Sequence, residues 1–203
     1  MGEKGQTPQK TTLWTPANVV TCIRVVLVPL WLLLAELVGP AAEDAPSWGG
    51  MAVFVCFVVL SLTDKLDGYL ARSRNEVTTF GKFLDPIADK LAVVVALCYL
   101  LEYGEVSSWV LLVVVGREFL VSGLRMVVAS KGQVVAASNL GKWKTATTMT
   151  SICGILLSDA LAPSVFSAGL LALSYVVLLV AVVFTIWSGV DYFIKCWPYV
   201  KEA

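Results

Sequence analysis

The sequence contains no histidine, and this absence narrows the kinds of site that the chain can form. Cysteine is present but scattered, and no CxxC pair occurs, so the usual ligand set of a zinc site is missing. The five cysteines are Cys22, Cys56, Cys98, Cys153 and Cys196. We therefore exclude a zinc site and expect the cysteines to be reduced, small apolar side chains.

Charged residues are also scarce. They make up 15% of the 203 residues, whereas hydrophobic residues make up 58%, and the mean hydropathy is +0.80. A soluble domain contains about 45–50% apolar residues, so this composition excludes an ordinary soluble domain and favours an integral membrane protein. The basic and acidic residues cancel at fifteen each. We expect membrane lipids as partners and no nucleic acid.

The N-terminal MGEKGQTPQKTT lacks the apolar segment of a secretory signal peptide, so we expect none. Beyond it, six apolar stretches approach the length of about 20 residues that a helix needs to cross a bilayer. They lie at 19–38, 48–70, 85–103, 109–128, 145–161 and 166–188. The sequence thus predicts an all-α integral membrane protein with six transmembrane helices in one bundle. Short connectors predict that consecutive helices are antiparallel neighbours.

Lysine and arginine are absent from every second connector. The segments 39–50, 102–108 and 158–165 contain no lysine or arginine. The two termini and the segments 71–84 and 129–144 contain lysine, arginine or both. By the positive-inside rule, both termini and the segment 71–84 lie in the cytoplasm. We predict a multi-pass protein of the cell (cytoplasmic) membrane, with an N-terminal tail and juxtamembrane segment at 1–18, one helical domain at 19–190 and a cytoplasmic tail at 191–203.

Four aspartates interrupt this apolar pattern in DKLDGYLARSRNEVTTFGKFLDPIADK, residues 64–90. The uncharged runs 48–63 and 91–101 are too short to span alone, so the second and third helices must include the aspartates at their cytoplasmic ends. Asp64 and Asp67 are three residues apart, and Asp85 and Asp89 are four apart, so each pair shares a helix face. Two antiparallel helices would bring these faces into one pocket.

Four carboxylates in one pocket repel, and protonation or a divalent cation relieves the repulsion. Ligands with oxygen only favour Mg²⁺, Mn²⁺ or Ca²⁺, and four carboxylates can hold two ions, an arrangement suited to phosphoryl transfer. Gly68, Ala71 and Gly81 leave space for a ligand, and Arg72 offers a planar fork for phosphate. The alternatives are ordinary interfacial charges and a divalent-cation transporter, since intramembrane carboxylates also mark ion paths.

The pattern D-x2-D-G-x2-A-R-x8-G-x3-D-x3-D at 64–89 resembles the signature of the CDP-alcohol phosphotransferases. TPANVVTCIR, GREFLVSGLR and NLGKWKT further resemble the bacterial phosphatidylglycerophosphate synthase branch of that family. The resemblance implies Mg²⁺ or Mn²⁺, two ions in number, held by Asp64, Asp67, Asp85 and Asp89, with Asp89 also the catalytic base. It also implies a homodimer and a CDP-binding site, whose residues are Asn18, Thr21, Gly68, Ala71, Arg72, Thr78 and Gly81.

Four cations point to the acceptor: Arg117, Arg125, Lys142 and Lys144. A cation within a span is costly unless it meets an anion or a wet cavity, and a phosphate on the acceptor would supply charge-assisted hydrogen bonds. With the resemblance, this predicts transfer of a phosphatidyl group from CDP-diacylglycerol to sn-glycerol 3-phosphate, giving phosphatidylglycerol phosphate and CMP. Inositol phosphate, inositol and serine are alternative acceptors. A pair of Arg117 with Glu118 or the aspartates, or of Glu118 with Arg125, is the structural alternative.

Overall fold

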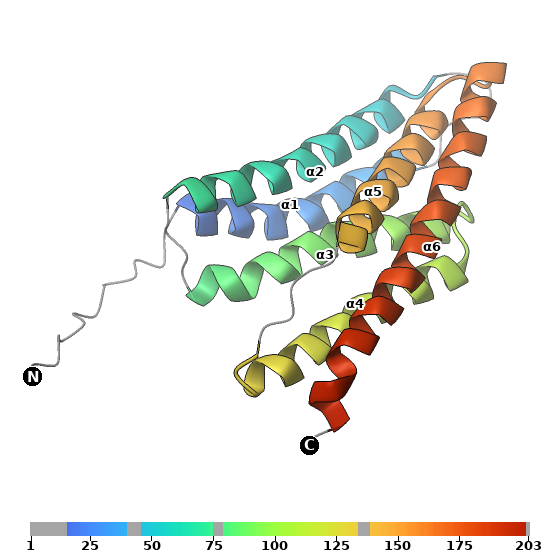
Figure 1. The fold of residues 1–203 in the computed structure, drawn as a ribbon. Coiled ribbons are helices and arrows are strands. Elements are labelled where there is room, and N and C mark those ends of the chain that lie inside the picture. The colour runs from blue at the N-terminus through green and yellow to red at the C-terminus, as the bar shows by residue number, and fades with distance from the viewer. Residues whose placement is uncertain (1–15, 40–45, 75–78, 134–138, 202–203) are drawn as a thin grey trace, which may run out of the picture.

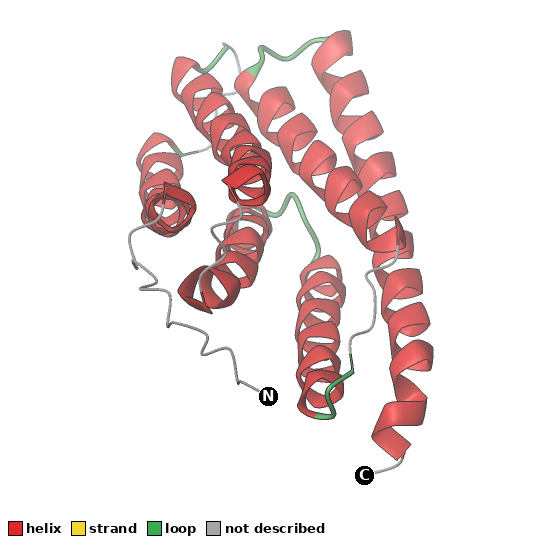
Figure 2. Cartoon of the chain, turned by 60° about the vertical axis from the view of Figure 1, so that its left-hand side comes forward, coloured by secondary structure: helices red, strands yellow, loops and turns green. Residues whose placement is uncertain are grey.

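The computed structural model describes residues 16–39, 46–74, 79–133 and 139–201, with the backbone alone at 16–17, 64–74, 79–86, 89 and 139. Within these ranges every regular element is a helix (Figure 2). The six helices are α1 (Pro16–Val38), α2 (Trp48–Arg74), α3 (Thr79–Glu102), α4 (Ser108–Ser130), α5 (Asn139–Ala160) and α6 (Val165–Lys201). The predicted all-α architecture with six helices is confirmed.

Two of these helices are long and apolar enough to cross a membrane by themselves. They are α1 over Asn18–Val38, with a mean hydropathy of 2.1, and α6, with a mean hydropathy of 2.7. In α2 the uninterrupted apolar part is the shorter segment Trp48–Thr63, which agrees with the expectation that this helix includes its aspartates in order to span. Six spans therefore remain a prediction, whereas six helices are observed.

Helix α6 does not end where its apolar stretch ends. The sequence placed the end of the last span at residue 188, but the helix continues to Lys201. Asp191 and Lys195 lie one turn apart beyond that point and form an ion pair of 2.7 Å, a spacing that supports a helix. Apolarity sets the length of a span, whereas local hydrogen bonding sets the length of a helix, so the two boundaries differ.

The helices do not all pack against their neighbours in sequence. The most extensive contact joins α5 to α6, α1 packs against both α2 and α3, α2 packs against α5, and α4 packs against α6. Between the described parts of α4 and α5 there is no close backbone contact, and Figure 1 shows α4 beside α6. The expectation that consecutive helices are neighbours is therefore wrong for this pair, because charged side chains and a cavity lie between them.

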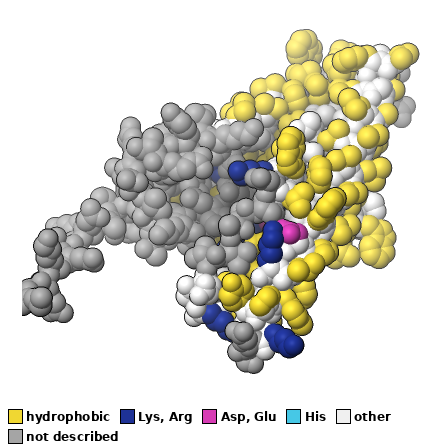
Figure 3. All heavy atoms as spheres, viewed as in Figure 1, with side chains coloured by type: hydrophobic (Ala, Val, Ile, Leu, Met, Phe, Trp, Pro, Cys, Tyr) yellow, Lys and Arg dark blue, Asp and Glu magenta, His cyan; other side chains and the backbone are white. Residues whose placement is uncertain are grey.

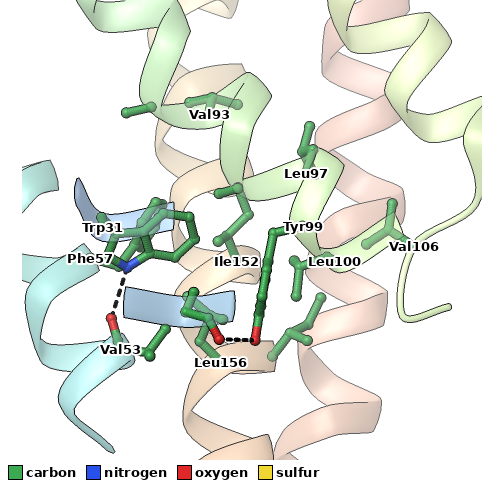
Figure 4. Close-up of a cluster of buried hydrophobic side chains, with 14 of the residues drawn as sticks. Trp31, Val53, Phe57, Val93, Leu97, Tyr99, Leu100, Val106, Ile152 and Leu156 are labelled. Carbon is green, nitrogen blue, oxygen red and sulfur yellow. Dashed lines mark hydrogen bonds between the residues drawn. The ribbon is translucent and has the colours of Figure 1, made fainter. Parts of the chain in front are cut away.

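The main core lies where α1, α2, α3 and α5 meet. Trp31 is its centre: its ring lies 5.2 Å from that of Phe57 and 5.8 Å from that of Tyr99, measured between centroids. The indole nitrogen of Trp31 donates a hydrogen bond of 3.0 Å to the carbonyl of Val53 (Figure 4). A smaller cluster joins α4 to α6 and consists of Val121, Val128, Tyr192 and Cys196.

The helix ends that flank basic segments gather at one end of the bundle. These are the start of α1, the end of α2, the start of α3, the end of α4, the start of α5 and the end of α6 (Figure 1). The opposite ends lead into the connectors without lysine or arginine. On the face in Figure 3, hydrophobic side chains cover most of the described surface and the basic ones lie away from its upper end. The fold thus has the two differently charged ends that the sequence predicts.

Candidate active site

The four aspartates lie on two helices whose ends meet at the same end of the bundle. Asp64 and Asp67 are near the C-terminal end of α2, and Asp85 and Asp89 are near the N-terminal end of α3. Both segments are helical, as the three- and four-residue spacings require for shared faces. Their side chains lie outside the described residues, so the convergence of the carboxylates stays a prediction. The donor set, carboxylate oxygens from two helices, fits a divalent ion.

The first helix brings polar side chains to the same end of the bundle. Asn18 and Thr21, predicted for the CDP site, are 3% and 2% exposed in the first turns of α1, followed one turn later by the buried Arg24. Helix α1 as a whole packs against both aspartate-bearing helices, α2 and α3.

For the other residues predicted for the CDP site, the structure describes the backbone only, and for one of them it describes nothing. Gly68, Ala71 and Arg72 lie in the last turns of α2, and Gly81 lies in the first turn of α3. Thr78 lies outside the described residues. Their side-chain geometry is therefore untested.

A cavity of about 300 Å³ lies between α3, α4 and α5 and is lined by basic side chains. Three of the four cations predicted for the acceptor, Arg117, Arg125 and Lys144, line it. Lys142 is exposed and is not among the lining residues. We call this space the basic cavity. Its apolar wall includes Val93, Val94, Val114, Val121 and Met149.

The basic cavity has a carboxylate at its centre. The Oε1 atom of Glu118 accepts hydrogen bonds from Arg117 Nη1, at 2.9 Å, and from Lys144 Nζ. The side chains of Glu118 and Lys144 are only 15% and 9% exposed, so the contact is shielded from solvent. The structural alternative that paired Arg117 with Glu118 is confirmed, whereas the ion pairs of Glu118 do not include Arg125.

A fourth cation belongs to the same cavity, and the sequence reasoning missed it. Lys90 Nζ lies 3.8 Å from Glu118 Oε2 and donates a hydrogen bond of 2.5 Å to Ser122 Oγ. Lys90 follows Asp89 directly on α3, so it links the basic cavity to the aspartate end of that helix. The sequence did contain a signal for this residue: Lys90 stands at the start of an apolar run, where a cation needs a nearby anion.

Arg117 contacts residues of its own helix and of α6, and it runs close to α5. Its Nε donates a hydrogen bond of 3.2 Å to Ser188 Oγ on α6, in addition to the bond with Glu118. A methyl group added at Gly189 would lie 3.2 Å from Arg117 Cγ, and one at Gly141 on α5 would lie 3.6 Å from Nη2. Gly189 therefore leaves space for this side chain, whereas a methyl group at Gly141 would make an ordinary van der Waals contact with it. Such fixation suits a group that must meet an anion in a defined position.

Taken together, four cations and one carboxylate surround the basic cavity, which leaves an excess of positive charge among the described side chains. A phosphate group is the natural complement of such a site, because arginine and lysine bind it by charge-assisted hydrogen bonds. The cavity shares α3 with Asp85 and Asp89, so an anion bound there would lie beside the helix that carries half of the predicted metal ligands.

Comparison with known proteins agrees with this geometry. The sequence profile of the CDP-alcohol phosphatidyltransferase family matches residues 14–187. A CDP-diacylglycerol–glycerol-3-phosphate 3-phosphatidyltransferase of Bacillus subtilis is 37% identical over 193 residues, covering 92% of this chain and 97% of the relative. One of Pseudomonas fluorescens is 39% identical over 191 residues, covering 91% of each. A cardiolipin synthase (CMP-forming) of Oryza sativa is 37% identical over 94% of this chain and 60% of the relative.

The profile extends from before the first helix to within α6, and it therefore includes both aspartate-bearing helices and the basic cavity. The apolar helices and the relatives together identify a membrane protein, and the family as a whole uses a divalent metal ion. The chain belongs to the CDP-alcohol phosphatidyltransferase family.

Proposed function

We propose that this protein transfers a phosphatidyl group from CDP-diacylglycerol to sn-glycerol 3-phosphate, releasing CMP and forming phosphatidylglycerol phosphate for phospholipid biosynthesis. The observation that carries the acceptor is the basic cavity, because three cations that surround Glu118 leave more positive charge than one carboxylate neutralises. The relatives of Bacillus and Pseudomonas bear names that specify the same two substrates. A neutral acceptor such as inositol would carry no negative charge to pair with the excess positive charge of the basic cavity.

The proposed catalytic residues are the four aspartates. Asp64, Asp67 and Asp85 would hold two divalent ions, Mg²⁺ or Mn²⁺, with Asp89 as a further ligand. Ions held there offset the negative charge of the diphosphate and of the departing CMP. Asp89 would accept the proton of the acceptor hydroxyl, whose oxygen then forms a bond to the β-phosphorus of CDP-diacylglycerol while the bond from that phosphorus to the CMP oxygen breaks.

The remaining residues of the proposal bind and orient the donor. Asn18 and Thr21 on the buried face of α1 would contact the nucleotide, together with Gly68 on α2, the helix against which α1 packs. Ala71, Arg72, Thr78 and Gly81 complete the proposed CDP site. We place the site at the cytoplasmic face of the cell membrane, where the diacyl tails remain in the bilayer, and we propose that the protein works as a homodimer.

An acceptor screen tests the proposal directly. Purified protein is given CDP-diacylglycerol, Mg²⁺ or Mn²⁺ and one acceptor at a time, and CMP release is measured for glycerol 3-phosphate, inositol phosphate, inositol, serine and phosphatidylglycerol. We expect rapid release with glycerol 3-phosphate only. Asp85→Asn or excess chelator should lower the rate at least 100-fold, because each removes charge stabilisation from the transition state. Turnover with another acceptor alone would reject the acceptor, and full activity in chelator would reject the metal.

A further inference from the structure

A carboxylate in a phosphate-binding cavity needs an explanation of its own. Among the described residues that line the basic cavity, Glu118 is the only acid. Its negative charge weakens the attraction between the cavity and a phosphate, and burying it has an energetic cost that only close partners offset. A cavity that served phosphate binding alone would bind more tightly without it.

The two oxygens of Glu118 have different surroundings. Oε1 accepts hydrogen bonds from Arg117 and Lys144, and these two contacts suffice to hold the cations in place. None of the described side chains donates a hydrogen bond to Oε2, and the ammonium of Lys90 lies 3.8 Å from it, beyond hydrogen-bond distance. The ammonium of Lys90 already donates to Ser122. An ionised carboxylate accepts about four hydrogen bonds, so Oε2 retains capacity for a donor that enters the cavity.

The other polar side chains that line the basic cavity are weaker hydrogen-bond acceptors for a ligand. The hydroxyl of Thr145 donates to the carbonyl of Gly141 at 3.1 Å, and that of Thr148 donates to the carbonyl of Lys144 at 2.8 Å. Ser122 Oγ already accepts the bond from Lys90. Glu118 Oε2 is therefore the strongest acceptor that the described wall presents to a ligand, and the cations around it would hold a phosphate nearby.

We propose that Glu118 is a specificity-determining residue that accepts a hydrogen bond from the second hydroxyl of the acceptor. This inference rests on the proposed function, since glycerol 3-phosphate carries two hydroxyls. The primary hydroxyl is the less hindered nucleophile, which leaves the secondary hydroxyl free to donate to Oε2 while the cations bind the phosphate. A site built around such a bond rejects an acceptor that lacks the hydroxyl, because the buried carboxylate oxygen then stays unpaired.

Comparing two acceptors in the natural protein and in Glu118 variants separates this role from a purely structural one. The two acceptors are glycerol 3-phosphate and 3-hydroxypropyl phosphate, which keeps the primary hydroxyl and the phosphate and lacks only the secondary hydroxyl. We expect the natural protein to prefer glycerol 3-phosphate by about 10- to 100-fold in kcat/KM, the range of a hydrogen bond to a charged group. Glu118→Gln should reduce this preference to a few-fold, and Glu118→Met should bring it close to one.

Arg125→Ala is the matched control. Arg125 lines the same cavity, but both acceptors carry the phosphate that it would contact, so its loss should lower both rates and leave their ratio unchanged. If Glu118 were only a counter-ion, its variants would also lower both rates equally. An unchanged ratio of kcat/KM between the two acceptors in Glu118→Gln and Glu118→Met would therefore overturn the inference.

If the variants do not fold, the natural protein alone can still reject the inference. A preference below about two-fold for glycerol 3-phosphate over 3-hydroxypropyl phosphate would reject a hydrogen bond to the second hydroxyl. Failure of the natural protein to use either phosphate while it uses another acceptor would instead reject the proposed function, so the two failures are distinguishable.

Discussion

At the scale of single residues, burial separates the cations of the basic cavity into two kinds. The side chains of Arg117 and Lys144 are 15% and 9% exposed, and both form ion pairs with Glu118. Removing either would take one close partner from a largely buried carboxylate and would destabilise the fold. Arg125 lines the cavity but is exposed. A substitution there can report on ligand binding with little effect on folding.

We therefore predict that Arg125→Ala raises the KM for glycerol 3-phosphate about 10-fold or more, because a charge-assisted hydrogen bond to phosphate is lost. The KM for CDP-diacylglycerol should change little. Lys142→Ala is the matched control, since Lys142 is also an exposed cation but does not line the cavity. Steady-state kinetics in mixed micelles measure both constants. Equal effects of the two substitutions would mean that the cavity is not where the acceptor phosphate binds.

The residues show how far the sequence could predict the site. The spacing of Asp64, Asp67, Asp85 and Asp89 identified two helix faces, because that inference needs only helical periodicity. The charges of Arg117 and Lys144 predicted an anionic partner, because a cation in an apolar segment needs one, and the structure pairs both with Glu118. The same reasoning could not rank Lys142 against Lys90, since which of two lysines reaches a cavity depends on how α3, α4 and α5 are rotated and spaced.

At the scale of helices, one aromatic cluster fixes the mutual positions of α1, α2 and α3. Trp31 is 4% exposed and contacts Phe57 and Tyr99, and its indole donates to a backbone carbonyl of α2. In lipid, close packing and hydrogen bonds between helices replace the hydrophobic effect as the source of association. This cluster therefore stabilises the arrangement of the helices that carry the aspartates.

We predict that Trp31→Ala lowers the thermal stability of the detergent-solubilised protein markedly, because replacing a buried tryptophan with alanine costs about 3–5 kcal/mol. Circular dichroism melts measure the midpoint. Trp187→Ala should change it little, since Trp187 on α6 is 60% exposed. A midpoint that is the same in Trp31→Ala as in Trp187→Ala would contradict the assignment of Trp31 to the centre of the core.

The helices also show what the sequence could not predict. Apolar runs predicted the positions of all six helices, because a helix that crosses a bilayer needs about 20 largely apolar residues. The pairing of α4 with α6, rather than with α5, was not predictable from connector length, since a connector limits the distance between two helix ends but not the contact along their length. The end of α6 at Lys201 was missed because Asp191 and Lys195 interrupt the apolar run, whereas the helix continues through them.

At the scale of the whole molecule, the two ends of the bundle differ in charge, and this difference predicts orientation. The helix ends that carry the aspartates or flank basic segments lie at one end of the bundle (Figure 1), whereas the segments 39–50, 102–108 and 158–165 contain no lysine or arginine. Cytoplasmic connectors carry the excess of basic residues. We therefore predict that the ends that carry the aspartates face the cytoplasm, where a soluble phosphorylated acceptor is present.

Cysteine labelling in intact cells tests this orientation. In a variant that lacks the five native cysteines, we place one cysteine at Lys131, which is exposed at the end of α4, or at Glu102, which is exposed at the end of α3. We predict that a membrane-impermeant maleimide labels Glu102→Cys in intact cells and labels Lys131→Cys only after permeabilisation, because the two positions lie at opposite ends of the bundle. Activity retained in both variants shows that each is folded. The reverse labelling pattern would place the aspartates and the basic cavity outside the cytoplasm, and a cytoplasmic phosphate ester could then not be the acceptor.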